Sequence, residues 1–153
     1  MKIDKVVEPA VREAFAASVA EEPDRFNAVV AEIADRGEDF TRDAVVLAVA
    51  VDAMALLALH DGERLDEEEL TAFARDFVES QGWADIAAAD AHRFLVAISG
   101  TERRLPDVLP LGDLGLISFA LGGWLLSAFL PEGMDWTHLL DELLDVLESA
   151  PEP

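Results

Sequence analysis

The fold is decided by a stretch of apolar residues, Ala44-Val45-Val46-Leu47-Ala48-Val49-Ala50-Val51. It lies in the middle of a helix that we predict to run from Thr41, as its N-cap, to about His60. Because this helix is apolar nearly all round, we expect it to lie at the centre of the molecule. A second apolar segment, from Asp113 to Leu130, is predicted to be the other central helix.

This second segment is too short to be a membrane span. If Asp113 is its N-cap, the uncharged part runs from Leu114 to Leu130, which at 1.5 Å per residue is roughly 26 Å, against a hydrocarbon core of about 30 Å. No cluster of basic residues marks a cytoplasmic flank. We therefore predict a buried helix and no membrane association.

Amphipathic helices are predicted around these two, and no run of alternating apolar residues indicates a strand. The residues placed to open these helices are Pro9, Pro23, Asp66, Asp85 and Asp135. The predicted fold is all-α, a single-domain bundle of about seven helices around two apolar central helices. We expect the domain to cover residues 1–150, with a long loop at 101–112 and a frayed tail at 151–153.

The chain combines strong acidity with an apolar composition. It has 32 acidic and 11 basic side chains, a net charge of -21, yet 52% of its residues are apolar and its mean hydropathy is +0.21. Apolar groups must therefore lie inside and carboxylates outside. The acidity argues against direct binding to nucleic acid or to an anionic bilayer surface. The chain has no cysteine, which excludes disulfides and thiolate sites, and without a recognisable secretory signal we expect a cytoplasmic protein.

The excess of acidic residues is concentrated in two segments. Residues 61–90 carry ten acids and two bases, a net charge of -8, and residues 132–153 carry seven acids and no base, a net charge of -7. If the two helices lie side by side, they form one anionic face that can bind a basic protein surface. If they lie apart, the acidity serves only the solubility of the protein. The acids predicted to contact a partner are Glu67, Glu68, Asp76, Glu79, Asp141, Glu142, Asp145 and Glu148.

These patterns favour a non-enzymatic acidic module that binds a basic protein partner, of the inhibitor, immunity, antitoxin or adaptor type. The sequence contains no G-x-S-x-G, P-loop, G-x-G-x-x-G or H-E-x-x-H motif that would indicate an enzyme. A small-molecule pocket around Gly122, Gly123 and Trp124 is an alternative. The sequence is also compatible with a homo-oligomer, and with acidity that reflects the salt adaptation of a whole proteome.

The segment between the third and fourth helices offers a candidate metal site. It reads His60-Asp61-Gly62-Glu63-Arg64-Leu65, followed by the acids at 66–69. It is not an EF-hand loop, because with Gly62 at the sixth position the first and third ligand positions fall on Leu57 and Leu59. A looser calcium or magnesium site would use Asp61, Glu63, Asp66 and Glu69. Otherwise this is a helix corner with an acidic first turn that the helix dipole favours, and no cofactor is predicted.

This corner resembles the pattern of TerB-type (tellurite-resistance) helical domains. In both, an apolar helix ends in Asp-Gly and is followed by an apolar residue, a capping acid and a glutamate that opens an amphipathic helix. Residues 128–135 are similar to a degenerate second copy, with Glu-Gly in place of Asp-Gly, and His60 replaces the small residue usual in that family. The resemblance implies an all-helical acidic domain with a metal-binding surface formed by Asp61, Asp66 and Glu69.

Asp52 is the only charged residue in the apolar middle of the third helix. It shares a helical stripe with Ala44, Ala48 and Ala55, and we expect this small-residue stripe to be an edge that reaches water. If Asp52 were buried instead, it would cost several kcal/mol or take up a proton, and it would be a candidate site with a raised pKa.

The histidines do not indicate a metal centre. They are His60, His92 and His138. None follows a glutamate by three residues, as the helical di-iron pattern requires, so we predict structural or exposed roles for all three.

Overall fold

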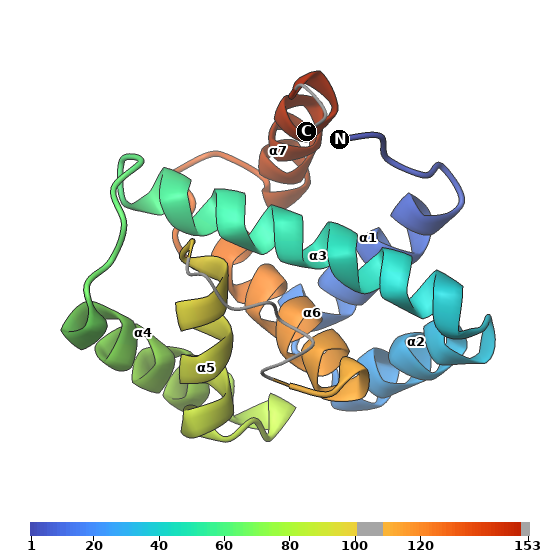
Figure 1. The fold of residues 1–153 in the computed structure, drawn as a ribbon, viewed down its shortest axis with the longest axis horizontal. Coiled ribbons are helices and arrows are strands. Elements are labelled where there is room, and N and C mark those ends of the chain that lie inside the picture. The colour runs from blue at the N-terminus through green and yellow to red at the C-terminus, as the bar shows by residue number, and fades with distance from the viewer. Residues whose placement is uncertain (101–108, 151–153) are drawn as a thin grey trace.

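The computed structural model describes residues 1–100 and 109–150, and every regular element among these residues is helical (Figure 1). The elements are α1 (Val7–Val19), α2 (Pro23–Asp35), α3 (Glu38–Leu59), α4 (Glu67–Ser80), the 3-10 turn η1 (Gly82–Ala84), α5 (Ala88–Ile98), α6 (Leu111–Ser127) and α7 (Trp136–Ser149). The predicted all-α bundle is confirmed. The predicted tail at 151–153, and residues 101–108 of the predicted long loop, lie outside the described residues.

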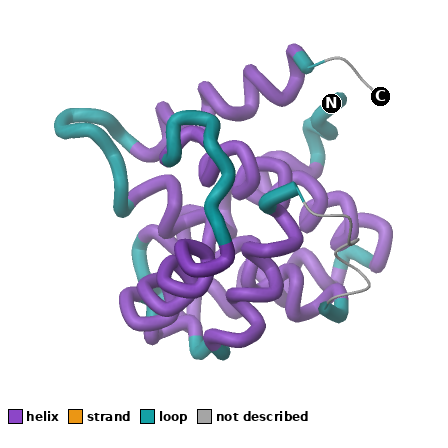
Figure 2. Tube along the Cα trace, turned by 60° about the vertical axis from the view of Figure 1, so that its left-hand side comes forward, coloured by secondary structure: helices purple, strands orange, loops and turns teal. Residues whose placement is uncertain are grey.

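The two apolar helices α3 and α6 form the centre of the bundle. In Figure 1, α3 crosses the front with α6 beneath it, α4 and α5 lie at the lower left, and α7 lies above. Figure 2 shows the same helices and their connecting loops from a second direction. Between Leu114 and Leu126 of α6, only Leu116 is exposed. No helix among the described residues has the length and apolarity needed to cross a bilayer.

Two helices, α4 and α7, begin at a capping side chain. The Asp66 carboxylate accepts a hydrogen bond from the backbone N–H of Glu69 at 2.8 Å, and the Glu69 carboxylate accepts one from the Asp66 N–H at 3.2 Å. This reciprocal pair is the predicted capping box of α4. Asp135 caps α7 in a simpler way, by accepting a hydrogen bond from the Thr137 N–H at 3.2 Å.

Four helices begin at residues other than those predicted. α1 begins at Val7, two residues before Pro9, and α6 begins at Leu111, so Asp113 lies in its first turn rather than at the N-cap. α3 begins at Glu38, so Thr41 lies inside its first turn rather than at the N-cap. Gly37 allows this earlier start, because its φ of 109° turns the chain directly from α2 into α3. α5 begins at Ala88 rather than near Asp85, because Asp85 adopts a left-handed conformation after η1, with φ of 52°.

α1 packs directly against the backbone of α6 at Gly122 and Gly123. A Cβ atom on Gly122 would lie 2.2 Å from the Phe15 ring, and one on Gly123 would lie 2.2 Å from Ser18 Oγ. The Ser18 hydroxyl donates a hydrogen bond to the Ala120 carbonyl oxygen at 2.9 Å. The glycines therefore permit a close helix contact, with Phe15 and Ser18 against them. The alternative of a small-molecule pocket around Gly122, Gly123 and Trp124 stays a prediction.

Candidate functional site

Asp52 is buried in the core. Its side chain has 0% exposure, and the other members of its stripe, Ala44, Ala48 and Ala55, are buried with it. A Cβ atom on Gly122 would lie only 2.6 Å from Asp52 Oδ1, so this stripe faces α6. The expectation that the stripe reaches water is wrong. Small side chains allow helices to approach closely, and here they bring α3 against the glycines of α6.

The environment of Asp52 favours its neutral form. Neither carboxylate oxygen has a hydrogen-bond partner among the described residues. Burial raises the pKa of the Asp52 carboxyl well above its ordinary value, because the charged form loses its hydration. Gly122 of α6 lies beside it, and the Phe15 ring approaches the same glycine from α1. Asp52 is therefore a buried acid whose carboxyl group has no hydrogen-bond partner among the described residues.

The eight acids predicted to contact a partner are all exposed, and they lie on α4 and α7. Figure 1 shows α7 above α3 and α4 below it, at separate places on the molecule. The structure thus brings Glu67, Glu68, Asp76 and Glu79 together on one helix. It brings Asp141, Glu142, Asp145 and Glu148 together on another, but it does not join the two sets into one face. By the criterion given above, this separation favours solubility as the role of the combined acidity, and a surface for a basic partner would have to be formed by one helix alone.

Most of these acids form no ion pair among the residues that the structure describes. The pairs that form are Asp141 with Arg12, Glu142 with His138, and Glu67 with His92. In the last pair, His92 Nε2 lies 2.9 Å from Glu67 Oε1 but is not aligned for a hydrogen bond. Within residues 1–100 and 109–150, no ion pair involves Glu68, Asp76, Glu79, Asp145 or Glu148.

The corner at Gly62 is exposed, as are its acids Asp61, Glu63, Asp66 and Glu69. Asp66 and Glu69 are engaged in the capping box, and the part of the chain that the structure describes has no group of three or more metal-ligating side chains placed to hold an ion. A calcium or magnesium site at this corner stays a prediction, as does the TerB resemblance that implies one. Calorimetric titration with each ion would test the metal site.

The His60 side chain packs against residues of α3 and α4. Its Nδ1 atom lies 2.8 Å from the Leu56 carbonyl oxygen, and its ring meets the Phe73 ring edge-on with centroids 5.7 Å apart. Phe73 in turn contacts Trp124, at 5.0 Å between centroids. His60 thus joins the end of α3 to the aromatic residues of α4 and α6, which agrees with a structural role.

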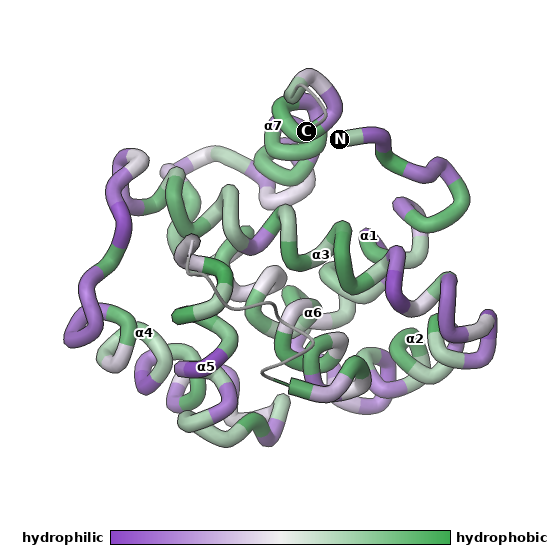
Figure 3. Tube along the Cα trace, viewed as in Figure 1, coloured by the Kyte–Doolittle hydropathy of each residue, from purple (hydrophilic) through white to green (hydrophobic). Residues whose placement is uncertain are grey.

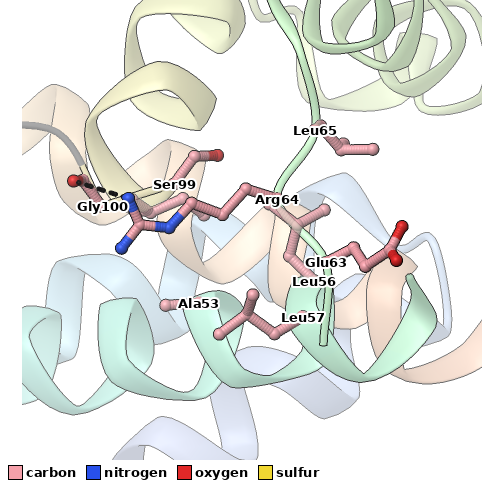
Figure 4. Close-up of a pocket in the computed structure, with 9 residues that line it drawn as sticks. Ala53, Leu56, Leu57, Glu63, Arg64, Leu65, Ser99 and Gly100 are labelled. Carbon is pink, nitrogen blue, oxygen red and sulfur yellow. Dashed lines mark hydrogen bonds between the residues drawn. The ribbon is translucent and has the colours of Figure 1, made fainter. Parts of the chain in front are cut away.

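A small pocket lies where the end of α3, the loop after it and the end of α5 meet (Figure 4). Its volume is about 80 Å³, and most of its lining is aliphatic, from Ala53, Leu56, Leu57, Leu65 and Ile98. Arg64 also lines it and donates to the Gly100 carbonyl oxygen at 3.5 Å. Sequence reasoning missed this pocket, because its three segments are separated along the chain and none of them carries a recognisable motif.

α3 also has an apolar face that is only partly covered by the described residues. Val46 is 52% exposed and Leu57 is 42% exposed, while Ala50 and Ala53 between them are half-buried. We call these four residues the α3 stripe, since their spacing places them on one side of the helix. Hydrophobic positions recur along α3 in Figure 3. The stripe leads into the pocket, because Ala53 and Leu57 belong to both.

Comparison of the chain with protein-family models, with curated proteins and with solved structures gives no match in any of the three.

Proposed function

We propose that this protein is a non-enzymatic acidic helical module that binds a basic protein partner, in the manner of an inhibitor, immunity protein, antitoxin or adaptor. The observation that supports this most is the set of exposed acidic residues on α4 and α7. Most of these residues form no ion pair within the described part of the chain. Exposed charges of this kind contribute little to the stability of the chain that carries them. They are well suited to attract and orient an oppositely charged protein.

α4 is the stronger candidate for the contact. It carries three consecutive glutamates in its first turn, Glu67, Glu68 and Glu69, and two further acids, Asp76 and Glu79. Two of the four predicted acids on α7 form ion pairs, whereas one of the four on α4, Glu67, does so. Because α4 and α7 lie on different sides of α3, a partner can engage one acidic helix without the other (Figure 1).

Affinity capture from the source organism, with the bound proteins identified by mass spectrometry, tests this proposal. We expect a basic protein that is retained at about 0.1 M salt and released at about 1 M salt, because the Debye length falls from about 10 Å to about 3 Å over that range. If no basic protein is recovered, or if the recovered complex is indifferent to salt, the proposal is contradicted. The acidity would then serve solubility or salt adaptation.

A further inference from the structure

We infer that the α3 stripe and the pocket at its end form the docking site for one amphipathic helix of the basic partner, an inference that rests on the proposed function. Exposed acids attract a basic protein, but a specific complex also needs apolar contact that water cannot reach. The α3 stripe supplies such a surface, with Val46 and Leu57 at its two ends. Ala50 and Ala53 between them are half-buried, so Val46 and Leu57 are the side chains that a bound helix would cover.

The size of the pocket determines what can enter it. Its volume of about 80 Å³ equals that of roughly two to three waters, at about 30 Å³ for each. Pockets for metabolites and cofactors hold about 300–1,000 Å³. This pocket therefore fits a single aliphatic side chain of a larger partner, and its walls of Leu56, Leu65 and Ile98 match such a side chain in polarity.

Acidic residues at both ends of the α3 stripe define the charge of the partner helix. Asp43 lies one turn before Val46 and has no ion pair among the described residues, whereas Arg42 is already paired with two acids of its own turn. At the other end Glu63 borders the pocket, and its carboxylate points away from the Arg64 guanidinium (Figure 4). The matching helix is apolar in its middle and basic at both ends.

The length of the site fits one short helix. Asp43 and Leu57 are separated by about 21 Å along the axis of α3, at 1.5 Å per residue, which is roughly four helical turns. An amphipathic helix of that length presents anchors at i, i+4, i+7 and i+11, as helices bound in apolar grooves do. A second copy of this chain is a poorer occupant, because each copy has a net charge of -21 and the two repel each other.

A designed peptide serves as the probe, with leucines spaced i, i+4, i+7 and i+11 and lysines at both ends of a helix of about four turns. Its binding is measured by calorimetry and mapped by the backbone amide signals in NMR spectra. Val46→Gln is the variant within the site. Val146→Gln on α7 is the matched control, because the two valines are 52% and 51% exposed. Both substitutions lie at the surface, so both variants are expected to fold.

We expect Val46→Gln to raise the Kd for the peptide about fivefold, since part of the burial of one valine is lost, and Val146→Gln to change it by less than about twofold. The amide signals that shift are expected on α3 and in the loop before α4. If the two variants bind alike, or if the shifts gather on α4 or α7, the docking site is wrong although the proposed function stands.

Two further outcomes are informative. If the peptide does not bind although a basic protein is captured, the docking site alone is overturned, whereas failure of both experiments overturns the proposed function as well. If the protein forms dimers that Val46→Gln abolishes, the stripe belongs to a second copy of the chain, and the inference of a basic helix is overturned.

Discussion

Asp52 places a carboxyl group in the core without a hydrogen-bond partner among the described residues. In the unfolded chain this group lies in water and titrates near the ordinary aspartate pKa of about 3.9. In the folded protein its pKa is raised by desolvation. At a pH above the unfolded-state pKa, Asp52 is ionised in the unfolded chain. On folding, its carboxylate must therefore either take up a proton or be buried with its charge. The contribution of Asp52 to stability is most favourable below that pKa and is lost as the pH rises toward the folded-state pKa.

At this residue scale, we expect Asp52→Asn to be more stable than the wild-type protein at pH 7 and to lose most of that difference at pH 4. Within the window between the two pKa values, the difference changes by up to about 1.4 kcal/mol per pH unit, the value for one proton. Denaturant unfolding at several pH values measures it. Asp43→Asn, exposed on the same helix, is the control. A pH-independent difference between Asp52→Asn and wild type would contradict this account.

At the scale of helices, the crossing of α1, α3 and α6 depends on the absence of side chains at Gly122 and Gly123. Phe15 and Asp52 approach the first glycine, and Ser18 approaches the second. These neighbours come from two helices, so the glycines fix how closely both α1 and α3 can approach α6. A methyl group added here would displace buried side chains that have little room to move.

We therefore expect Gly122→Ala to lower the free energy of unfolding by about 1–3 kcal/mol or more, through overpacking against Phe15. Gly115→Ala, in the same helix, is the matched control. Its nearest contact would be Val45 at an ordinary 3.5 Å, so the better helix propensity of alanine should stabilise the protein by up to about 1 kcal/mol. Chemical denaturation compares the two variants, and equal losses of stability would contradict the packing described for Gly122.

The capping box of α4 gives a second prediction for a helix. Asp66→Ala removes the acceptor for the Glu69 N–H and should cost about 1 kcal/mol of unfolding free energy. Glu69→Gln removes a charge but keeps the side-chain acceptor for the Asp66 N–H, so it should cost less than half as much. Thermal unfolding monitored by circular dichroism measures both. A larger loss in Glu69→Gln than in Asp66→Ala would show that charge rather than capping stabilises this helix end.

The features that the sequence predicted correctly are those set by local chemistry. The capping residues Asp66 and Asp135 fix the starts of α4 and α7 through hydrogen bonds to residues close in the chain. The burial of Asp52 was not predicted, because a stripe of alanines is compatible both with a solvent edge and with a close helix contact. Gly122, which Asp52 of that stripe approaches, was the signal that could have decided between the two.

The exposed side of α3 and the pocket were not predicted for a related reason. An apolar residue such as Val46 satisfies a helical pattern equally well when buried and when left uncovered. Which sides of α3 the other helices cover depends on their crossing angles and loop lengths. The pocket likewise requires the end of α5 to lie beside the loop after α3, a long-range contact that hydrophobic periodicity does not specify.

At the scale of the whole molecule, a net charge of -21 on 153 residues must work against the compact state, because like charges repel one another. We expect the melting temperature to rise by several degrees when sodium chloride is raised from low to moderate concentration, as the repulsion is screened. A variant in which surface acids are neutralised should show a smaller rise. If salt has no effect on the melting temperature, or lowers it, ion pairs rather than repulsion dominate the surface.

Exposed acids at defined positions are proposed to recruit the basic partner. The most direct test measures how much partner is recovered by two variants, each with three acids neutralised. The measurement is made at about 0.1 M salt, where the Debye length is about 10 Å. One combines Glu68→Gln, Asp76→Asn and Glu79→Gln on α4. The control combines Asp24→Asn, Glu32→Gln and Asp35→Asn, which are equally numerous exposed acids on α2. We predict that the α4 variant loses most of the partner and that the α2 variant recovers as much as wild type. Equal recovery by both variants would contradict the claim.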